Sequence, residues 1–355
     1  MRPIIAPTPV EPVVAGRTPT FSVIIAAYQA AETVARAVES ALGQTSPPHE
    51  VIVCDDGSTD GIERALDPLR DRIVFLSQAN GGEGSAKNAA AGAASGDFVA
   101  ILDADDLYLP ERLEALGELA SARPDLDILT TDAYLEVDGR VVRHAYDETW
   151  TFEVADQRAA ILERNFIFGH AAVRRSALVG AGGFDESIRW TTDWECWLRL
   201  IFAGSRAGLV DEPLARYRLH EGALSSRRAA MLRGRVMTLE KAAATADRLD
   251  LTQAEGRILE GSLAAQRRKA AVEEAQELLC DGDRDARRRS LAIATGRGHD
   301  APTRLKAAAA AIAPGLARRL MRRRRRRSWV GAAGVRVTRR NVERQSGQRS
   351  GSGRI

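Results

Sequence analysis

The chain has 355 residues, with 51 lysine and arginine residues against 48 aspartate and glutamate residues, for a formal net charge of +3. Residues 301–355 hold 16 basic residues and one acidic residue, a net of +15, whereas residues 1–300 carry a net of −12. This distribution excludes a uniformly basic nucleic-acid-binding protein and indicates an acidic body with a cationic tail.

The three cysteines, Cys54, Cys196 and Cys280, lie far apart in the sequence. Their spacing excludes a disulfide framework and a CxxC metal pair, and it fits a reducing compartment. The longest nearly continuous apolar stretch, residues 307–314, is much shorter than the roughly 20 residues that a membrane-spanning helix needs. Residues 1–19 are proline-rich, lack the apolar run of a signal peptide and are predicted to form an extended leader. We therefore expect a cytoplasmic protein.

Short apolar runs alternate with helix-compatible stretches through the first hundred residues. Strands are predicted at Phe21–Ala26, Glu50–Cys54, Arg72–Leu76 and Asp97–Leu102, and helices at Ala31–Leu42, Gly61–Leu69 and Gly84–Ala94. Strands alternating with helices indicate βαβ units and a mostly parallel sheet, so the predicted fold class is α/β. In such sheets ligands bind at the carboxyl ends of the strands.

The next section has a different pattern. A β-hairpin is predicted from Asp127–Glu136 and Arg140–His144, because Asp-Gly stands between them. Further strands are predicted at Phe166–Val173 and Leu209–Leu219, on either side of a helix that ends near Ala203.

The composition from residue 227 onward is rich in alanine, arginine and leucine, which predicts helices. We expect a helical extension over residues 227–321, broken near Asp281–Gly282 and Gly296–Pro302, after a main domain at residues 20–226. Arg322–Arg327 is an unbroken arginine run, and residues 322–355 are predicted to be a disordered basic tail.

The first candidate site follows the second strand, where Asp55 and Asp56 precede Gly57. A carboxylate at a strand end can accept hydrogen bonds from a nucleotide base or ribose. The alternative is a turn and a helix cap formed by Ser58, Thr59 or Asp60. That alternative explains Asp56 less well, because two adjacent acids at a buried edge need a cation or a donor nearby.

A second acidic group, Asp103, Asp105 and Asp106, follows the fourth strand. Hard oxygen ligands of this kind suit Mg²⁺ or Mn²⁺, which keeps water and substrate phosphates in the rest of its shell. The alternative is a solvated acidic loop, and the neighbouring acidic strand end favours the metal site. Between the two groups, Gly81 and Gly82 precede a predicted helix that carries Lys87. A helix start with a nearby lysine can bind an anion, but the alternative is a flexible loop, and the pattern favours the anion site only weakly.

Asp193 lies near the start of a predicted helix, after the glycine pair at 182–183 and among tryptophans. Apolar walls raise the pKa of a carboxyl group, so Asp193 is a candidate general base, although a helix-terminal acid is the alternative. The stripe formed by Trp190, Trp194 and Trp197 is interpreted as core. His220 can face a metal or a diphosphate, whereas His170 is interpreted as a core residue.

Together these motifs resemble the family 2 glycosyltransferases, inverting enzymes of the GT-A fold, over Thr20–Ser226. The resemblance rests on Ser22–Gln29, Val53–Asp60, Lys87-Asn88, Leu102–Asp106, Gly182–Glu186 and Asp193–Glu195, which occur in the order and spacing of that family. Two departures are Ala26 and Gln29, which stand where the family usually has proline and asparagine. Thr192 replaces a frequent acid.

The resemblance implies a role for each matching residue. Nucleotide-binding residues would be Ala26, Tyr28, Asp56, Lys87 and Asp103; metal ligands would be Asp105, Asp103 and His220; the catalytic base would be Asp193. Tyr28 would stack near the base, Asp56 would accept a hydrogen bond from the base imide, and Asp105 would be the direct ligand of the cation.

The function that follows is transfer of a sugar from a nucleoside diphosphate-sugar to an acceptor hydroxyl with inversion, assisted by Mg²⁺ or Mn²⁺. A uridine diphosphate donor is favoured, with thymidine and guanosine forms open, and the acceptor is expected to be a glycan or a lipid-linked sugar. The basic tail predicts contact with an anionic membrane surface, and no nucleic acid is expected.

Two alternatives are a sugar nucleotidyltransferase and a non-catalytic nucleotide-sugar-binding protein. Ala26–Gln29 argues against the first, because a Gly-rich, basic signature belongs there, and the intact acidic residues argue against the second.

Overall fold

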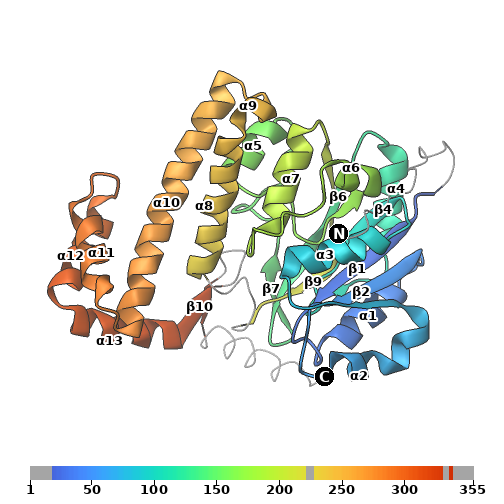
Figure 1. The fold of residues 1–355 in the computed structure, drawn as a ribbon, viewed down its shortest axis with the longest axis horizontal. Coiled ribbons are helices and arrows are strands. Elements are labelled where there is room, and N and C mark those ends of the chain that lie inside the picture. Colours follow the sequence, from blue (N-terminus) through green and yellow to red (C-terminus); the bar gives the residue numbers. More distant parts are fainter. Residues whose placement is uncertain (1–17, 221–227, 331–335, 339–355) are drawn as a thin grey trace, which may run out of the picture.

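The computed structural model describes residues 18–220, 228–330 and 336–338. Its centre is a nine-stranded mixed sheet in the order β3-β2-β1-β4-β8-β6-β9-β5, with β7 paired to β6 (Figure 1). The strands are β1 Phe21–Ala27, β2 Glu50–Asp55, β3 Val74–Ser77, β4 Phe98–Ile101, β5 Leu107–Tyr108, β6 Ile128–Val137, β7 Arg140–His144, β8 Ala172–Arg174 and β9 Ala207–Arg218.

The first half of the sheet is parallel, as predicted. β1 pairs with β2 on one side and with β4 on the other, and β2 pairs with β3. The connecting helices are α1 (Val34–Leu42), α2 (Ile62–Leu66) and α3 (Glu83–Ala93). β1 and β2 are almost wholly buried because helices cover both faces, which is why their sequences are continuous apolar runs. The predicted helix at Gly61–Leu69 ends at Leu66 and gives way to a 3₁₀ turn that has proline in its first turn.

The second half of the sheet is mixed. β8 runs antiparallel to β4 and β6, and β9 runs parallel to β6. The predicted hairpin is confirmed: Asp138 and Gly139 both have positive φ, as a two-residue turn between β6 and β7 requires.

The strand predicted at Phe166–Val173 is wrong except at its end, because only Ala172–Arg174 joins the sheet. Phe166 and Ile167 are buried in the core, but their segment is a loop. The hydroxyl of Tyr146 donates to the Phe166 carbonyl and accepts from the Phe168 amide, so a side chain satisfies the backbone groups that a strand would pair.

Four further helices pack around the sheet: α4 Arg112–Ala122, α5 Gln157–Glu163, α6 Arg175–Gly180 and α7 Thr192–Phe202. Trp194 and Trp197 on α7 are fully buried, so their interpretation as core is confirmed, whereas Trp190 precedes the helix. The Trp194 indole donates to the Ile161 carbonyl at 2.8 Å and thereby ties α7 to α5.

The C-terminal part is helical, as predicted. It comprises α8 Arg228–Ala244, α9 Ala246–Leu249, α10 Gln253–Asp281, α11 Asp285–Thr295, α12 Ala301–Ile312 and α13 Pro314–Arg327, followed by the short strands β10 Ser328–Val330 and β11 Arg336–Thr338. Leu239 on α8 and Leu259 on α10 lie in the same apolar core as Trp194, so these two helices are built onto the sheet domain. Figure 1 shows α8 and α10 side by side next to α7, with α11–α13 farther out.

The outer helices form a small second core, in which Leu279, Ala286 and Ala310 are buried. The arginine run was predicted to begin a disordered tail, but α13 continues to Arg327. Among the described residues, no helix is both long and apolar enough to cross a membrane. Most of the predicted leader and tail, residues 1–17, 331–335 and 339–355, lies outside the described residues.

Candidate active site

The carboxyl ends of β1, β2 and β4 meet at one edge of the sheet and lead into Tyr28, Asp56 and Asp103. The strand order reverses between β1 and β4, because the chain leaves β1 toward β2 on one side and returns to β4 on the other. Such a switch point is where open α/β sheets bind ligands. Three of the residues singled out in the sequence are therefore brought to one edge.

Asp56 is buried and closes the loop between β3 and α3. Its Oδ1 accepts from the Gln78 side chain and the Gly81 amide, and its Oδ2 accepts from the Gly82 amide, each at 2.8 Å. These donors explain how two adjacent acids coexist at the sheet edge. A carboxylate oxygen can accept two hydrogen bonds, so Oδ2 keeps one free acceptor position.

The turn after Asp56 does not cap α2, whose first turn has no side-chain cap. Instead Ser58 Oγ accepts from the Gln29 amide, and Asp60 Oδ2 accepts from the Ala31 amide. These bonds hold the loop that presents Tyr28, whose side chain is exposed. Ala26 lies in β1 just before that loop, half-buried and paired in register with Cys54.

Lys87 on α3 is only 4% exposed and forms an internal ion pair. Its ammonium lies 2.5 Å from Glu83 Oε1 and 3.8 Å from Asp103 Oδ1. Burial would lower the pKa of Lys87, but these two carboxylates outweigh it and raise the pKa, so the ammonium stays charged. Burial would likewise raise the pKa of Asp103, but Lys87 and His170 hold it well below its usual range. Lys87 therefore helps to keep Asp103 deprotonated.

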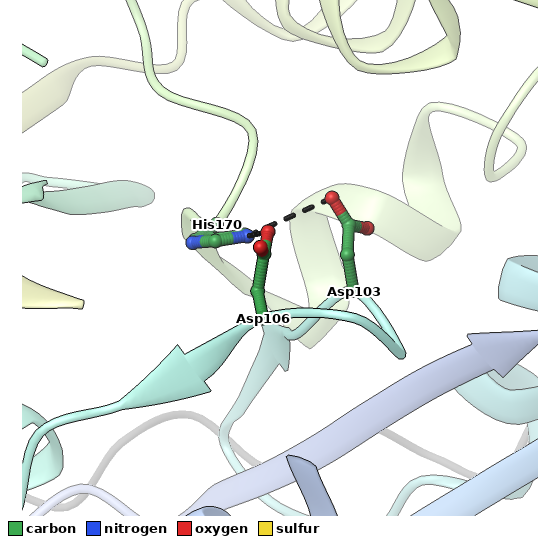
Figure 2. Close-up of side chains that lie close together, drawn as sticks. All are labelled: Asp103, Asp106 and His170. Atoms are coloured by element: carbon green, nitrogen blue, oxygen red, sulfur yellow. Dashed lines mark hydrogen bonds and ion pairs between the residues drawn. The ribbon is translucent and has the colours of Figure 1, made fainter. Parts of the chain in front are cut away.

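Asp103, Asp106 and His170 form the cluster shown in Figure 2, and their ligand atoms lie within 4.8 Å of one another. His170 Nε2 is 2.7 Å from Asp106 Oδ2 and 3.6 Å from Asp103 Oδ2. Burial would lower the pKa of His170, but Asp106 and Asp103 raise it to about 9. Asp106 and His170 are each 1% exposed, so they form a buried ion pair. His170 is a core residue, as expected from the sequence.

Asp105 forms a separate pair with His220. Asp105 Oδ2 is 2.9 Å from His220 Nε2, and the two side chains are 34% and 49% exposed. The loop is joined to the end of β9 because the Arg218 amide donates to Asp106 Oδ1 at 2.7 Å. A carboxylate and an imidazole that both reach solvent, with the third-exposed Asp103 two residues earlier in the same loop, fit a cation that must also contact a diphosphate.

Asp193 lies in the first turn of α7. Its Oδ2 accepts a hydrogen bond from the side-chain amide of Asn165 at 2.9 Å. It also lies close to Gly169, since a Cβ added to that glycine would be 3.6 Å from Oδ2. Burial raises the pKa of Asp193, and the charge of Lys87 partly opposes this. The charges of Lys87 and Asp103 act on Asp193, so the start of α7 and the loop that holds Asp103 lie around one site.

A comparison with protein families shows what this part of the chain is similar to. Residues 22–180 match the model described as "Glycosyl transferase family 2". The chain is 32% identical over 201 residues to a hyaluronan synthase of Pasteurella multocida, an alignment that covers 55% of this chain and 20% of that protein. It is also 32% identical over 223 residues to the succinoglycan biosynthesis protein ExoO of Rhizobium meliloti, covering 59% of this chain and 63% of ExoO. The chain thus spans less than two thirds of the length of these curated relatives.

Solved structures confirm the predicted GT-A fold. S. aureus TarS residues 1–349 in complex with UDP-GlcNAc superpose with a TM-score of 0.56 at 18% identity, covering 86% of this chain and 92% of that one. The mannosyltransferase PcManGT from Pyrobaculum calidifontis, in complex with GDP-Man and Mn²⁺, gives a TM-score of 0.52 at 20% identity, covering 89% and 87%. At these identities the likeness concerns the fold.

Two residues of the site were missed in the sequence. Asn165 stands in the run Arg164-Asn165-Phe166 without a motif, and its contact with Asp193 bridges 28 positions. Arg235 lies in the helical extension and its charge interacts with Asp193. Nothing in an alanine- and arginine-rich helix distinguishes one arginine from its neighbours, so only the packing of α8 reveals it.

Proposed function

We propose that the chain is an inverting, metal-dependent glycosyltransferase that moves a sugar from a nucleoside diphosphate-sugar to an acceptor hydroxyl in the synthesis of cell-surface polysaccharide or glycolipid. The observation that carries the proposal is the position of Asp193. It is a half-buried carboxylate whose pKa is raised by burial, and the charges of Lys87 and Asp103, which pair with each other at the ligand edge of the sheet, act on it. The names of the relatives, a hyaluronan synthase and a succinoglycan biosynthesis protein, support a polysaccharide product.

In this proposal Asp193 removes the proton of the acceptor hydroxyl. The resulting oxygen attacks the anomeric carbon while the bond to the nucleoside diphosphate breaks, and the diphosphate leaves with the bonding electron pair. A single displacement on the face opposite the leaving group inverts the anomeric configuration. A raised pKa makes Asp193 a stronger base, and Asn165 holds the carboxylate in one orientation.

We assign a divalent cation, Mg²⁺ or Mn²⁺, to Asp105 and His220, with Asp103 as the further oxygen ligand. When bound, the cation would neutralise negative charge on the diphosphate. The choice of ligands rests on exposure: Asp105 and His220 reach solvent, whereas Asp106 and His170 are committed to each other. In this assignment the buried Asp106–His170 pair holds the loop after β4 in place.

The donor would lie at the ends of β1 and β2. The exposed ring of Tyr28 would stack on the base, and the free acceptor position on Asp56 Oδ2 would accept from the base imide. Ala26 would line the approach, and Lys87 would act through Asp103. We favour a uridine nucleotide, because the TarS structure was solved with UDP-GlcNAc, and keep guanosine as the competitor, because PcManGT was solved with GDP-Man.

Thermal shift with UDP, GDP and dTDP, each with Mn²⁺ and with EDTA, tests the nucleotide and the metal together. The expected result is a Mn²⁺-dependent increase in melting temperature that is largest for UDP, and Mn²⁺-dependent release of UDP from a UDP-sugar. Equal shifts in EDTA would contradict the metal assignment. Absence of a shift with all three nucleotides would contradict the proposed function.

We further propose that the outer helices rest on the cytoplasmic surface of an anionic membrane. Leu305 and Ile312 on α12 and Leu316 and Leu320 on α13 are all exposed, Ile312 by 83%. The arginine run follows in the same helix. Each basic residue near an anionic bilayer contributes about 1 kcal/mol, so apolar and electrostatic contacts would act together. The three free cysteines support a reducing compartment.

Co-sedimentation with vesicles tests this proposal. Replacing Arg323–Arg327 by glutamine leaves Arg322, which donates to the Cys280 carbonyl, in place. The wild type is expected to bind phosphatidylglycerol vesicles, less so at higher salt. The variant is expected to lose most of this binding. Equal binding of both proteins, or equal binding to neutral vesicles, would contradict the proposal.

A further inference from the structure

Helix α8 packs against the start of α7 more closely than most residues permit. A Cβ on Gly234 would lie 3.0 Å from Thr191 Oγ1 and 3.2 Å from Trp190 Cβ, so any other residue there would force these neighbours to shift. One turn later, the hydroxyls of Thr238 and Thr191 are 2.9 Å apart and buried. Because Thr191 stands two residues before Asp193, this contact fixes α8 beside the proposed catalytic base.

A second attachment holds the far part of α8. The ammonium of Lys241 donates to Asp185 and Ser187, in the loop that follows the glycine pair. The same loop is bound to α3, because Asn88 donates to the Phe184 carbonyl and accepts from the Phe184 amide. The position of α8 relative to the site is therefore set by the start of α7 and by the loop at residues 184–187, which α3 holds in turn.

Arg235, next to Gly234, is half-buried at this contact. Burial lowers the pKa of its guanidinium, while Asp193 opposes the shift, so the two charges act on each other. Other half-buried arginines of the chain are paired: Arg174 donates to Asp127 and Arg199 to Glu195, both at 2.7 Å. Within residues 18–220, 228–330 and 336–338, the Arg235 guanidinium forms no hydrogen bond or ion pair.

The nitrogens of Arg235 are not among the fully buried polar atoms, so an anion from outside the chain can reach the half-buried guanidinium and bind it. We propose that Arg235 binds an anionic group, a phosphate or a carboxylate, on the acceptor, beside the hydroxyl that Asp193 deprotonates. This inference rests on the proposed function. In a single displacement the acceptor and the leaving diphosphate stand on opposite faces of the anomeric carbon. Asp193 marks the acceptor face and Asp105 the diphosphate face, so a guanidinium beside Asp193 serves the acceptor.

The planar guanidinium matches phosphate and carboxylate groups, which it can bind through two parallel hydrogen bonds. The helical extension would then supply acceptor selectivity, since α8 lies outside residues 22–180, the part that matches the family model. An acidic polysaccharide and a phosphate-bearing glycolipid offer these two anions, and matched acceptors distinguish them.

The experiment compares acceptors that differ only in charge: methyl β-glucoside, methyl β-glucuronide and methyl β-glucoside 6-phosphate. Release of nucleoside diphosphate is measured with Mn²⁺ for the wild type, Arg235→Gln, Arg235→Lys and the control Arg233→Gln. Arg233 is on the same helix but exposed, and it lies 3.8 Å from Glu274 and Glu277. Binding of each compound in the presence of UDP is measured in parallel by thermal shift.

We expect the wild type to prefer one anionic acceptor over the glucoside in kcat/KM by about 10- to 100-fold, the usual effect of a hydrogen bond to a charged group. Preference for the glucuronide would identify a carboxylate and preference for the 6-phosphate a phosphate. Arg235→Gln should remove the preference through KM, Arg235→Lys should restore part of it, and Arg233→Gln should retain it.

An equal preference in the wild type and Arg235→Gln, or no anion-dependent binding by the wild type, would overturn the inference. Loss of donor hydrolysis in Arg235→Gln with an unchanged preference would also overturn it, because the guanidinium would then serve the donor. Failure of the wild type to hydrolyse any nucleotide-sugar would instead refute the proposed function itself.

Discussion

The proposed donor side and the proposed acceptor side of the site differ in how their polar groups are satisfied. On the donor side, Asp56 accepts three hydrogen bonds from the protein, and Asp103 lies between Lys87 and His170. On the acceptor side, Asp193 accepts from Asn165, and Arg235 has no partner among the described residues. The donor side is thus largely preorganised by the chain, whereas the acceptor side leaves charges for the ligand to complete. The difference predicts that donor binding survives changes on the acceptor side.

Replacing Asp193 by asparagine should have the largest effect on activity and should leave the donor side unchanged. It removes the proposed base, so turnover should fall by roughly 10²–10⁴-fold. Because the donor groups are held independently, the affinity for UDP with Mn²⁺ should hold. Steady-state kinetics and UDP titration measure the two quantities. Asp247→Asn, an exposed acid on α9, is the control. A loss of UDP affinity at unchanged turnover would make Asp193 a binding residue instead.

Replacing Asp105 by asparagine should affect the donor side alone. A neutral amide is a poor substitute for a charged oxygen ligand, so activity should fall roughly 100-fold and the Mn²⁺-dependent part of UDP binding should disappear. The exposed Asp211 on β9 gives a matched control, Asp211→Asn. Full activity of the wild type in EDTA would show that the acidic loop holds no catalytic metal.

Replacing Asn165 by alanine tests how the acceptor side positions its base. Asn165 Oδ1 accepts from the Ile167 amide, which turns the side-chain amide group toward Asp193. Loss of one hydrogen bond to a charged group should lower kcat about 10-fold. The hydrogen bond lowers the pKa of Asp193, so its removal should raise that pKa.

The pH profile of kcat shows whether Asn165 acts on Asp193. The base must be deprotonated, so kcat falls as pH decreases through the pKa of Asp193, and in Asn165→Ala this acidic limb should move to higher pH. Lys87, Glu83, Asp103 and Arg235 also act on Asp193 and are unchanged in the variant. Asn165→Ser, which keeps a donor, should recover part of the loss. A lower kcat with an unmoved limb would indicate a structural role only.

The smallest effect concerns the junction between the sheet domain and the extension. Glu255 caps α10 together with Thr252 and pairs with Arg158 on α5, which lowers the pKa of Glu255 to about 2. A lowered pKa stabilises the fold above the unfolded value near 4.5, and this stability is lost as pH falls from there toward 2. Glu255→Gln should cost about 1 kcal/mol, a decrease in Tm of roughly 1–3 °C at pH 7 that vanishes at low pH. The exposed Glu260→Gln should change little.

The features that the sequence could predict are local, and those it could not predict depend on contacts between distant residues. The parallel strands, the hairpin at Asp138-Gly139 and the acidic strand ends are local patterns, and they were predicted closely. The strand at Phe166–Val173 was mispredicted, because its apolar residues are buried in a loop whose backbone bonds to Tyr146, a partner about 20 residues away. Asn165 and Arg235 gain their meaning from contacts with Asp193 across 28 and 42 positions, and no local pattern encodes such contacts.

The central claim is a single displacement at a metal-dependent donor site with Asp193 as the base. The most direct measurement is the anomeric configuration of the sugar released to water, recorded by NMR before mutarotation, from the nucleotide-sugar that gives the largest Mn²⁺-dependent thermal shift. The account predicts that the first sugar to appear has the configuration opposite to that of the donor, that its release stops in EDTA, and that Asp193→Asn releases it far more slowly. Release with retained configuration, or release that is indifferent to EDTA and to the substitution, would contradict the account.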